Sequence, residues 1–392
     1  MIALDLPPLT DSEASHQARV IARIGEEIAA AGGWLSFERF MDLALYAPGL
    51  GYYATGVHPI GACGDYTTAP ELSEVFGRCL ATSVAAVLDA VGEGEVLEVG
   101  AGSGILAAQI LAELARQGRT PRRFRILEVS AALRALQKET LAREVPEQAG
   151  RVAWLDRLPE SSWRGAIVAN EVADALPVTR FGVAAKGVQE HGVIWTGQSL
   201  AWSPRPAAEA LVGDVRAIEA ELGHVFGPGY VSEYARRAGP WLASLTASLE
   251  RGVIYVLDYG LPRIEYYAPT RIGGTLSCFY RQRVHGDPFR NVGLQDITAW
   301  VDFTRLAGAG IDAGLELAGF TTQAHFLLDC GFARHLTAVI ADADAAGRYT
   351  SVQRATTLVL PGEMGEKFKC LALSRAVDPP PGFAGVDLAT RL

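Results

Sequence analysis

Three glycines alternate with other residues directly after a short apolar run, in the stretch EVLEVGAGSGILA over residues 95–107. Gly100, Gly102 and Gly104 would let the backbone approach a ligand closely, and the free N–H groups of a following helix would face it. Dinucleotide-binding enzymes use the spacing G-x-G-x-x-G, which needs glycine where this chain has Ile105. The spacing therefore favours S-adenosylmethionine over a dinucleotide, and a tight turn without any ligand is the alternative.

Two acidic residues stand where a nucleoside cofactor would need them. Glu98 precedes the first glycine by two residues, which completes the pattern E-x-G-x-G-x-G. Glu128 lies near the end of the next apolar run, RFRILEVS, where its carboxylate could accept hydrogen bonds from both hydroxyls of a ribose. The order of strand, glycine turn, helix and second-strand acid indicates cofactor binding rather than packing alone.

A parallel sheet is the element that would hold these residues together. From residue 95 onward, short apolar runs alternate with helical stretches, which predicts an α/β protein with a doubly wound sheet. The expected strands are 95–100, 123–130, 151–155, 165–172 and 252–260, with helices over 104–117 and 131–144.

The flanking segments predict helices and a hairpin. Helical periodicity runs over 15–45 with a break at 32–34, and the capping-box spacing of Thr68 and Glu71 around Pro70 predicts a helix from about residue 68. Further expectations are a hairpin over 179–203, helices near 206–222 and 229–249, an irregular stretch over 261–305, and two strand-like runs over 355–375.

These elements suggest five parts of the chain. They are an N-terminal helical cap (15–78), the cofactor-binding α/β core (79–203), inserted helices (204–250), the rest of the sheet with a lid and a helical insertion (251–376), and a loose tail (377–392).

Composition narrows the class of protein. The 392 residues include five cysteines without a CxxC pair and seven histidines without HExxH, so no metal site is expected. No apolar run reaches the ~18 residues of a membrane helix, and no basic leader begins the chain, so a cytoplasmic protein without membrane insertion is expected. The net charge of −9 disfavours nucleic acid as a partner.

One region could be interpreted differently. Arginines and tyrosines alternate over 258–303, as in proteins that stack on bases, but such a loop is more often an internally paired segment or a lid, and the lid is favoured. Asp296 is expected to cap the helix after it rather than to bind a metal.

Several longer runs resemble one family. The chain resembles the MidA-like family of class I S-adenosylmethionine-dependent methyltransferases, the bacterial relatives of the mitochondrial complex I assembly methyltransferases. The likeness extends from about residue 20 to 375. It implies a class I methyltransferase (Rossmann-like) fold with added N-terminal and inserted helical elements. The runs that carry it are GDYTTAPELSEVFG, LEVGAGSG, ILEVSAALRALQ, ANEVADALPV, LDYG, EYYAPTRIGGTLSCFYR, GLQDITAWVDFT and LPGEMGEKFK.

The resemblance also implies roles for single residues. The three glycines would line the methionine end of S-adenosylmethionine, and Glu128 would hold the ribose, with Ser130 and Gln137 nearby. Asp156 would lie near the adenine, Asn170 and Glu171 beside the reactive methyl, and Thr68, Pro70 and Glu71 would close the pocket. Relatives often carry aromatic residues in place of Val172 and Ala173.

The acceptor is expected to be a protein side chain, namely an arginine nitrogen, and the family resemblance implies a respiratory-complex subunit. A guanidinium needs carboxylates to orient it, and Glu171 and Asp174 are the candidates. Glu171 could instead be a surface charge, and Asp174 could cap a helix starting near Ala175. A small-molecule methyltransferase and a non-catalytic assembly factor that keeps the cofactor pocket are the alternatives.

Overall fold

One twisted sheet forms the centre of the molecule. The computed structural model describes residues 6–55, 67–341 and 344–392. The strand order is β15-β16-β10-β5-β2-β3-β4, with the short β14 beside β10. Strands β10, β5, β2, β3 and β4 are parallel, whereas β16 is antiparallel to both of its neighbours, so β15 beyond it runs in the same direction as β10. Their bounds are β2 Glu95–Val99, β3 Phe124–Leu127, β4 Val152–Leu155, β5 Trp163–Asn170, β10 Leu249–Leu261, β14 Val301–Asp302, β15 Glu316–Thr322 and β16 Phe368–Arg375.

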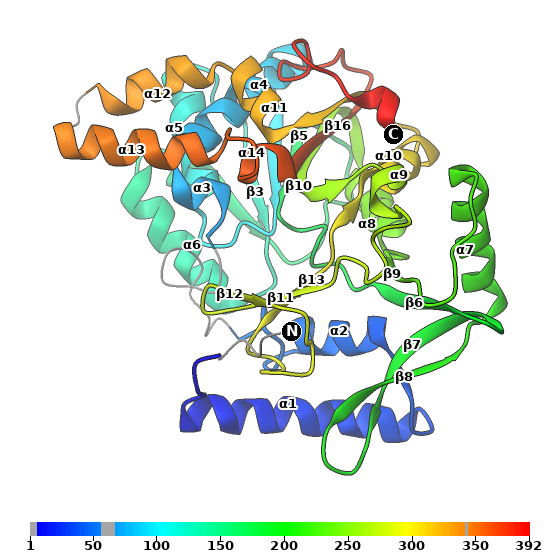
Figure 1. The fold of residues 1–392 in the computed structure, drawn as a ribbon. Helices are drawn as coiled ribbons and strands as arrows, with labels where there is room; N and C mark the ends of the chain where they lie inside the picture. The colour runs from blue at the N-terminus through cyan, green and yellow to red at the C-terminus, as the bar shows by residue number, and fades with distance from the viewer. Residues whose placement is uncertain (1–5, 56–66, 342–343) are drawn as a thin grey trace.

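Helices cover both faces of this sheet, as the doubly wound prediction requires (Figure 1). One apolar core lies under α4 and α5, and the other lies under α8 and α10. Because both faces are covered, the inner strands are apolar along their length instead of alternating. The helices around the two cores are α3 Ala69–Leu72, α4 Glu74–Val91, α5 Ile105–Arg116, α6 Ala131–Glu144, α8 Ala238–Thr246, α10 Phe303–Asp312, α11 Gln323–Asp329, α12 Phe332–Ile340, α13 Ala345–Thr357 and α14 Met364–Lys367.

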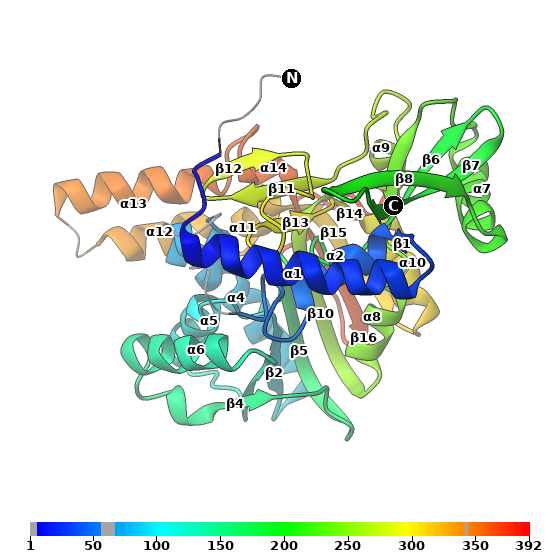
Figure 2. The same cartoon turned by 90° about the horizontal axis from the view of Figure 1, so that it is seen from below.

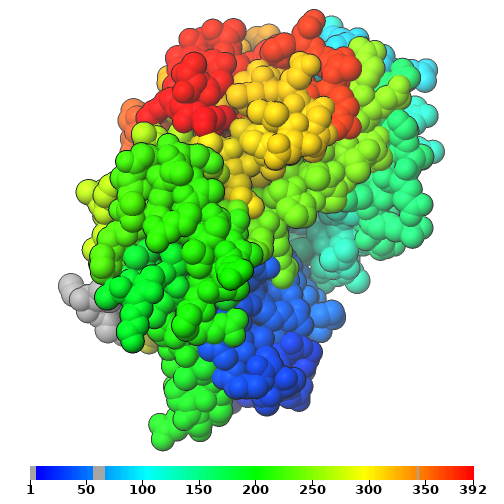
Figure 3. All heavy atoms as spheres, turned by 90° about the vertical axis from the view of Figure 1, so that its right-hand side faces the viewer, coloured from blue at the N-terminus to red at the C-terminus, as the bar shows by residue number. Residues whose placement is uncertain are grey.

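A second layer is built from the N-terminus and the middle of the chain (Figure 2). The helices α1 and α2 share an apolar core with a sheet of order β1-β7-β6-β9, in which β8 also pairs with β7. The predicted hairpin over 179–203 is confirmed, with β8 as a third strand. Figure 3 shows the green segment that carries α7 beside the blue N-terminal layer. The bounds are α1 Asp11–Ala30, α2 Phe37–Tyr46, β1 Leu35–Ser36, β6 Thr179–Ala184, β7 Gly187–Trp195, β8 Leu200–Pro206, α7 Glu209–Leu222 and β9 Val231–Tyr234.

Residues 261–305 are more regular than predicted. They contain α9 Arg263–Tyr266 and a three-stranded sheet of β12 Arg283–His285, β11 Ser277–Tyr280 and β13 Asp296–Thr298. Tyr266, Tyr267 and Tyr280 are buried, so their rings do not offer a stacking surface to bases. Arginines of the stretch are paired internally, as Arg263 is with Asp302 at 3.2 Å. Internal pairing of this kind does not test the lid that the sequence favours, so the lid remains a prediction.

Three local predictions are wrong, and one is confirmed in part. The helix expected over 229–249 is β9 followed by α8, because residues 231–234 add an edge to the second sheet. Only β16 is a strand within 355–375, since the first run continues α13. Asp296 lies in β13 and caps nothing; α10 begins at Phe303 and is capped by Asp302, which accepts from the Arg305 N–H at 3.1 Å. The helix predicted from about residue 68 is confirmed by α3, which has Thr68 at its N-cap position and Pro70 in its first turn, although Thr68 makes no side-chain cap bond and the longer α4 follows after Ser73.

The C-terminal segment is also better ordered than the predicted loose tail. Phe383 is buried against Phe326, and the Gly385 N–H donates to Asp329 at 2.8 Å. Leu388 N–H donates to the carbonyl of Phe320 in β15 at 2.6 Å. The tail therefore packs along the edge strand of the main sheet because that strand would otherwise expose unpaired backbone groups.

Neither a membrane helix nor a metal cluster is found within the described residues. No helix there is both long and apolar enough to cross a bilayer. Across the same residues, no three His, Cys, Asp or Glu side chains gather as metal ligands would.

Candidate cofactor and acceptor site

The glycine turn joins β2 to α5 in a conformation that side chains would prevent. Gly100, Gly102 and Gly104 have φ angles of 67°, 52° and 84°, in the left-handed region. A Cβ on Gly100 would lie 2.8 Å from Val172 Cγ2, and one on Gly104 would lie 3.1 Å from Gln137 Cα. The glycines therefore serve both the backbone turn and a close approach of neighbouring segments.

A cavity of about 50 Å³ lies where this turn meets α3 and the end of β5. The short helix α3 lies over the turn, since Ser103 Oγ donates to Glu71 and Gln109 Nε2 donates to the Pro70 carbonyl at 2.8 Å. The cavity brings together most of the residues predicted for the methionine end and its cover. Its lining is Thr68, Pro70, Glu71, Glu98, Gly100, Ala101, Gly102, Ser103, Ile105, Leu106, Asn170 and Glu171.

Glu98 is a buried carboxylate without a complete set of partners. Its side chain is 2% exposed, and Oε2 has no hydrogen-bond partner among the described residues. Burial raises its pKa to about 8. A cation bound in the cavity would favour the ionised form of this buried acid. The ammonium and the sulfonium of S-adenosylmethionine are such cations. The residues present therefore fit this cofactor.

Glu128 and Gln137 connect the turn to the second strand. Glu128 accepts from the Ser130 N–H at 2.8 Å and from Gln137 Nε2 at 3.1 Å, and Gln137 Nε2 also lies 3.1 Å from the Gly102 carbonyl. Each carboxylate oxygen has a second lone pair left for a ribose hydroxyl. Ser130 is the N-cap of α6, so Ser130 and Gln137 hold Glu128 in place.

Asp156 lies apart from the small cavity. Its side chain is 85% exposed and paired with Arg134. It lines a separate, open cavity of about 730 Å³ formed by residues 154–161 after β4. Its predicted place near an adenine remains a prediction.

Polar groups gather at the end of β5, where the predicted acceptor residues lie. Glu171 has φ 53°, and its Oε1 accepts from the Ala69 N–H at 3.4 Å and from Asn170 Nδ2 at 3.3 Å. Burial, together with the charge of the nearby Asp174, raises the pKa of Glu171 to about 8. Asp174 is 5% exposed with Oδ1 unpartnered within the described chain, and burial raises its pKa to about 6. No helix begins at Ala175, so the capping alternative for Asp174 is wrong.

The sequence did not point to two residues around this site, Asp258 and Asp296. Asp258 ends the buried part of β10 and accepts hydrogen bonds from the turn after β5. Asp296 accepts from Tyr53 Oη at 2.8 Å, and its charge contributes to the raised pKa of Glu171, after burial and Asp174. Asp258 stands in the LDYG run at the end of a predicted strand beside 165–172, which was a usable signal. Asp296 could not be found, because β13 was not predicted.

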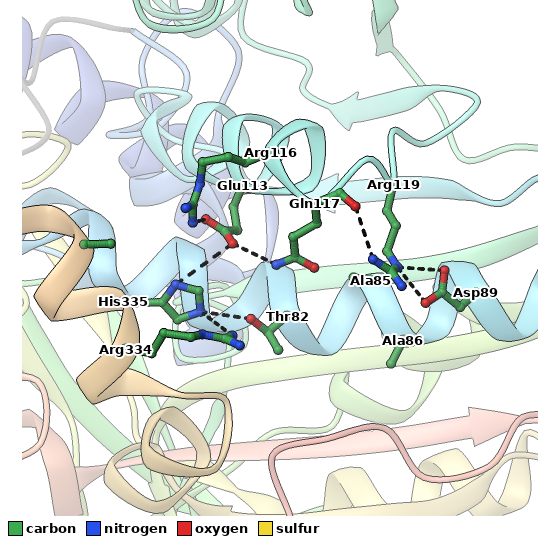
Figure 4. Close-up of a pocket in the computed structure, with 11 residues that line it drawn as sticks. Thr82, Ala85, Ala86, Asp89, Glu113, Arg116, Gln117, Arg119, Arg334 and His335 are labelled. Carbon is green, nitrogen blue, oxygen red and sulfur yellow. Dashed lines mark hydrogen bonds and ion pairs between the residues drawn. The ribbon is translucent and has the colours of Figure 1, made fainter.

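A larger cavity of about 510 Å³ lies between α4, α5 and α12, away from the glycine turn (Figure 4). The polar groups that line it bond mainly with one another: Gln117 Nε2 donates to Glu113 at 2.8 Å, and Arg119 Nε lies 2.6 Å from Asp89. Glu113 is at the far end of α5 from the turn. Ligands of open α/β sheets bind at the carboxyl ends of the strands, and this cavity does not lie there. Its larger size is therefore no reason to place the chemistry in it.

The fold and the site together define a class I methyltransferase: a parallel sheet in which one antiparallel strand, β16, lies between β10 and the edge strand β15, and a glycine turn at the strand ends. The chain belongs to the family described as putative S-adenosyl-L-methionine-dependent methyltransferase, whose model matches residues 79–321. The expected family, fold class and cofactor are confirmed. S-adenosyl-L-methionine is the cofactor of this methyltransferase.

Individual relatives cover nearly the whole chain. The crystal structure of a protein from Burkholderia thailandensis bound to S-adenosyl-homocysteine is 40% identical, with a TM-score of 0.94 over 99% of this chain and 100% of that one. The mitochondrial protein arginine methyltransferase NDUFAF7 of Danio rerio is 26% identical over 91% of this chain and 87% of its own length. Its human counterpart is 27% identical over 87% and 80%.

These relatives correct one expectation. The NDUFAF7 proteins that the chain resembles are mitochondrial, which contradicts the cytoplasmic location inferred from the sequence. The acidic N-terminal residues were therefore not a sound basis for assigning a compartment.

Proposed function

We propose that this methyltransferase transfers the methyl group to an arginine nitrogen of a protein substrate. The observation that carries the proposal is the pair of carboxylates, Glu171 and Asp174, at the strand end beside the cavity, each with a raised pKa. Glu171 is half-buried and Asp174 is buried with an unpartnered Oδ1, so a cation beside them would be favoured, and a guanidinium is a planar cation that a carboxylate can bind through two hydrogen bonds. The names of the NDUFAF7 relatives support the same acceptor.

The chain's own residues would act by orientation. S-adenosyl-L-methionine supplies an electrophilic methyl group. Glu171 and Asn170, at the mouth of the cavity, would hold the nitrogen in line with that methyl, and such alignment can lower a barrier by about 7–11 kcal/mol. The nitrogen–carbon bond forms as the sulfur–carbon bond breaks, and the nitrogen then loses a proton. The raised pKa of the nearby carboxyls makes them suitable acceptors of that proton.

The cofactor roles are part of this proposal. Glu128 would accept from the ribose hydroxyls, the three glycines would admit the methionine end, and Glu98 would face its positive charge. Thr68, Pro70 and Glu71 would cover the pocket, and Asp156 would approach the adenine. A subunit of a respiratory complex is the protein acceptor that we propose, on the strength of the family resemblance.

The experiment is transfer of a labelled methyl group to a cell extract and to a synthetic peptide that contains arginine. We expect label in protein, and methylarginine after acid hydrolysis. Glu171→Gln keeps the size of the side chain but removes its charge, so it should retain cofactor affinity and lose most transfer. Label in a small molecule instead would favour the small-molecule methyltransferase, and binding of cofactor without any transfer would favour the assembly factor.

A further inference from the structure

The carboxylate of Asp258 holds four backbone N–H groups. Its Oδ2 accepts from Val172 at 3.2 Å, Ala173 at 2.9 Å and Asp174 at 3.1 Å. Its Oδ1 accepts from the Tyr259 N–H at 2.9 Å. Asp258 is fully buried at the end of β10, the strand next to β5. The turn after β5 is therefore fixed by a side chain from the neighbouring strand.

This turn needs to be held, because it begins in an unfavourable conformation. Glu171 has a backbone φ angle of 53°, which residues other than glycine rarely adopt. The Glu171 N–H donates to the Leu257 carbonyl at 2.9 Å, and the next three N–H groups donate to Asp258. Both sides of the strained residue are thus tied to β10. Strain of this kind persists only where the surroundings impose it, and it is concentrated at functional sites.

The held turn sets the direction of two carboxylates. Glu171 lines the cavity beside the glycine turn, and the buried Asp174 has an oxygen without a partner in the described part of the chain. The Ala299 N–H donates to the Asp174 carbonyl at 3.0 Å, which ties the end of the turn to the segment after β13. The ammonium of Lys369, the register partner of Asp258, points to the Lys367 and Glu366 carbonyls, so it does not neutralise the carboxylates.

We propose that Asp258 is a positioning residue of the acceptor site: by binding the N–H groups of residues 172–174, it presents Glu171 and Asp174 together to a cationic acceptor. Asp258 itself has no contact with the acceptor or the cofactor in this arrangement. The cationic acceptor rests on the proposed function, whereas the control of the turn by Asp258 does not. The two can therefore fail separately.

The test compares Asp258→Asn and Asp258→Ala with the wild-type full-length protein. For Asp258→Ala we expect kcat for methyl transfer to an arginine peptide to fall about 100-fold, as a misplacement near 1 Å can cause. Asp258→Asn keeps one oxygen for the three N–H groups, so it should recover part of that loss. The affinity for S-adenosyl-homocysteine should stay within about threefold, since the glycine turn does not depend on Asp258.

Hydrogen exchange gives a measurement that does not depend on turnover. The amides of residues 172–174 should lose protection in both variants, while those of β2 and β5 keep it. Asp302→Asn is the matched control, because Asp302 is also a buried strand-end carboxylate but caps α10. Unchanged protection at 172–174, or an equal loss of cofactor affinity and turnover, would overturn the proposal. If the wild type does not methylate arginine, the proposed function fails and the exchange result alone decides the role of Asp258.

Discussion

Two glutamates with raised pKa values lie at the two ends of the proposed site. Glu98 and Glu171 both have a pKa raised to about 8 by burial. Glu98 lies on β2 before the glycine turn, where the cofactor is expected, and Glu171 lies after β5, where the acceptor is expected. At neutral pH the cofactor-free protein therefore holds protons on groups that a bound cation would ionise.

Acceptor affinity should consequently depend on pH. A guanidinium needs ionised Glu171, and ionising it costs free energy below pH 8, so the KM for an arginine peptide should fall as pH rises from 6.5 to about 8. Steady-state kinetics at saturating cofactor measure this. Glu171→Gln cannot ionise at this position and should show a high KM with a weaker pH dependence. A wild-type KM that is flat over this interval would contradict a role for the Glu171 charge.

Stability without cofactor should depend on pH in the opposite sense. The pKa of Glu98 is 4.5 unperturbed and about 8 in the folded protein, so the folded state binds the extra proton between these values. The free energy of unfolding contributed by Glu98 therefore falls as pH rises from 4.5 to 8. Glu98→Gln should lose less thermal stability than the wild type between pH 5 and 8. If the melting temperatures of the wild type and Glu98→Gln fell equally with rising pH, the ionised form of Glu98 would already be stabilised by other groups of the protein.

At the scale of elements, close contacts between β2, β5 and β10 depend on glycine. Gly165 and Gly252 are register partners with φ angles of 143° and 148°. A Cβ on Gly165 would lie 1.8 Å from the Glu95 carbonyl oxygen, and one on Gly252 would lie 1.8 Å from the Gly165 oxygen. The strands that carry the cofactor and acceptor residues are thus aligned at their starts as well as at their ends.

Gly165→Ala should destabilise the fold by about 2–4 kcal/mol, because it combines backbone strain with a clash against β2. Chemical denaturation measures the free energy of unfolding. Gly150→Ala is the control, since nothing lies within 4 Å of its added Cβ and Gly150 lies in the 3-10 helix Ala149–Arg151. A loss at Gly165 no larger than at Gly150 would mean that the strands can shift apart freely.

The sequence predicted the elements that have strong local signals. The parallel strands, the glycine turn and α5 were recognised because apolar runs and glycine spacing are local features. The β9 strand and β13 were missed, since short strands are decided by their pairing partners rather than by their own residues. For the same reason Glu171 was recognised from its place after β5, whereas Asp296 was not recognised as a neighbour of the site.

At the scale of the whole molecule, the C-terminal segment completes the main sheet. Phe383 is 6% exposed and lies against the position of Gly319 in β15, where a Cβ would be 2.3 Å from its ring. Asp387 accepts from the Phe320 N–H at 3.1 Å. The edge of the sheet is thus covered by side chains and hydrogen bonds from the last residues of the chain.

Phe383→Ala should therefore lower the free energy of unfolding by about 3–5 kcal/mol, as expected for a buried phenylalanine. Leu360→Ala is a suitable control because Leu360 is 46% exposed, and it should change stability by less than about 0.5 kcal/mol. Thermal and denaturant unfolding of both variants would decide this. Equal stability of the two would show that the tail is only loosely attached.

The position of β16 also determines when the main sheet can be completed during synthesis. β16 lies between β10 and β15 and pairs with both, although it follows them in sequence by many residues. Until residues 368–375 have left the ribosome, β10 has an open edge, and the turn held by Asp258 rests on a strand that is paired on one side only. Chains that stall before this point would expose apolar strand edges and be prone to aggregate. A nascent chain could thus acquire its glycine turn early, but the alignment of the proposed acceptor site only after β16 has been made.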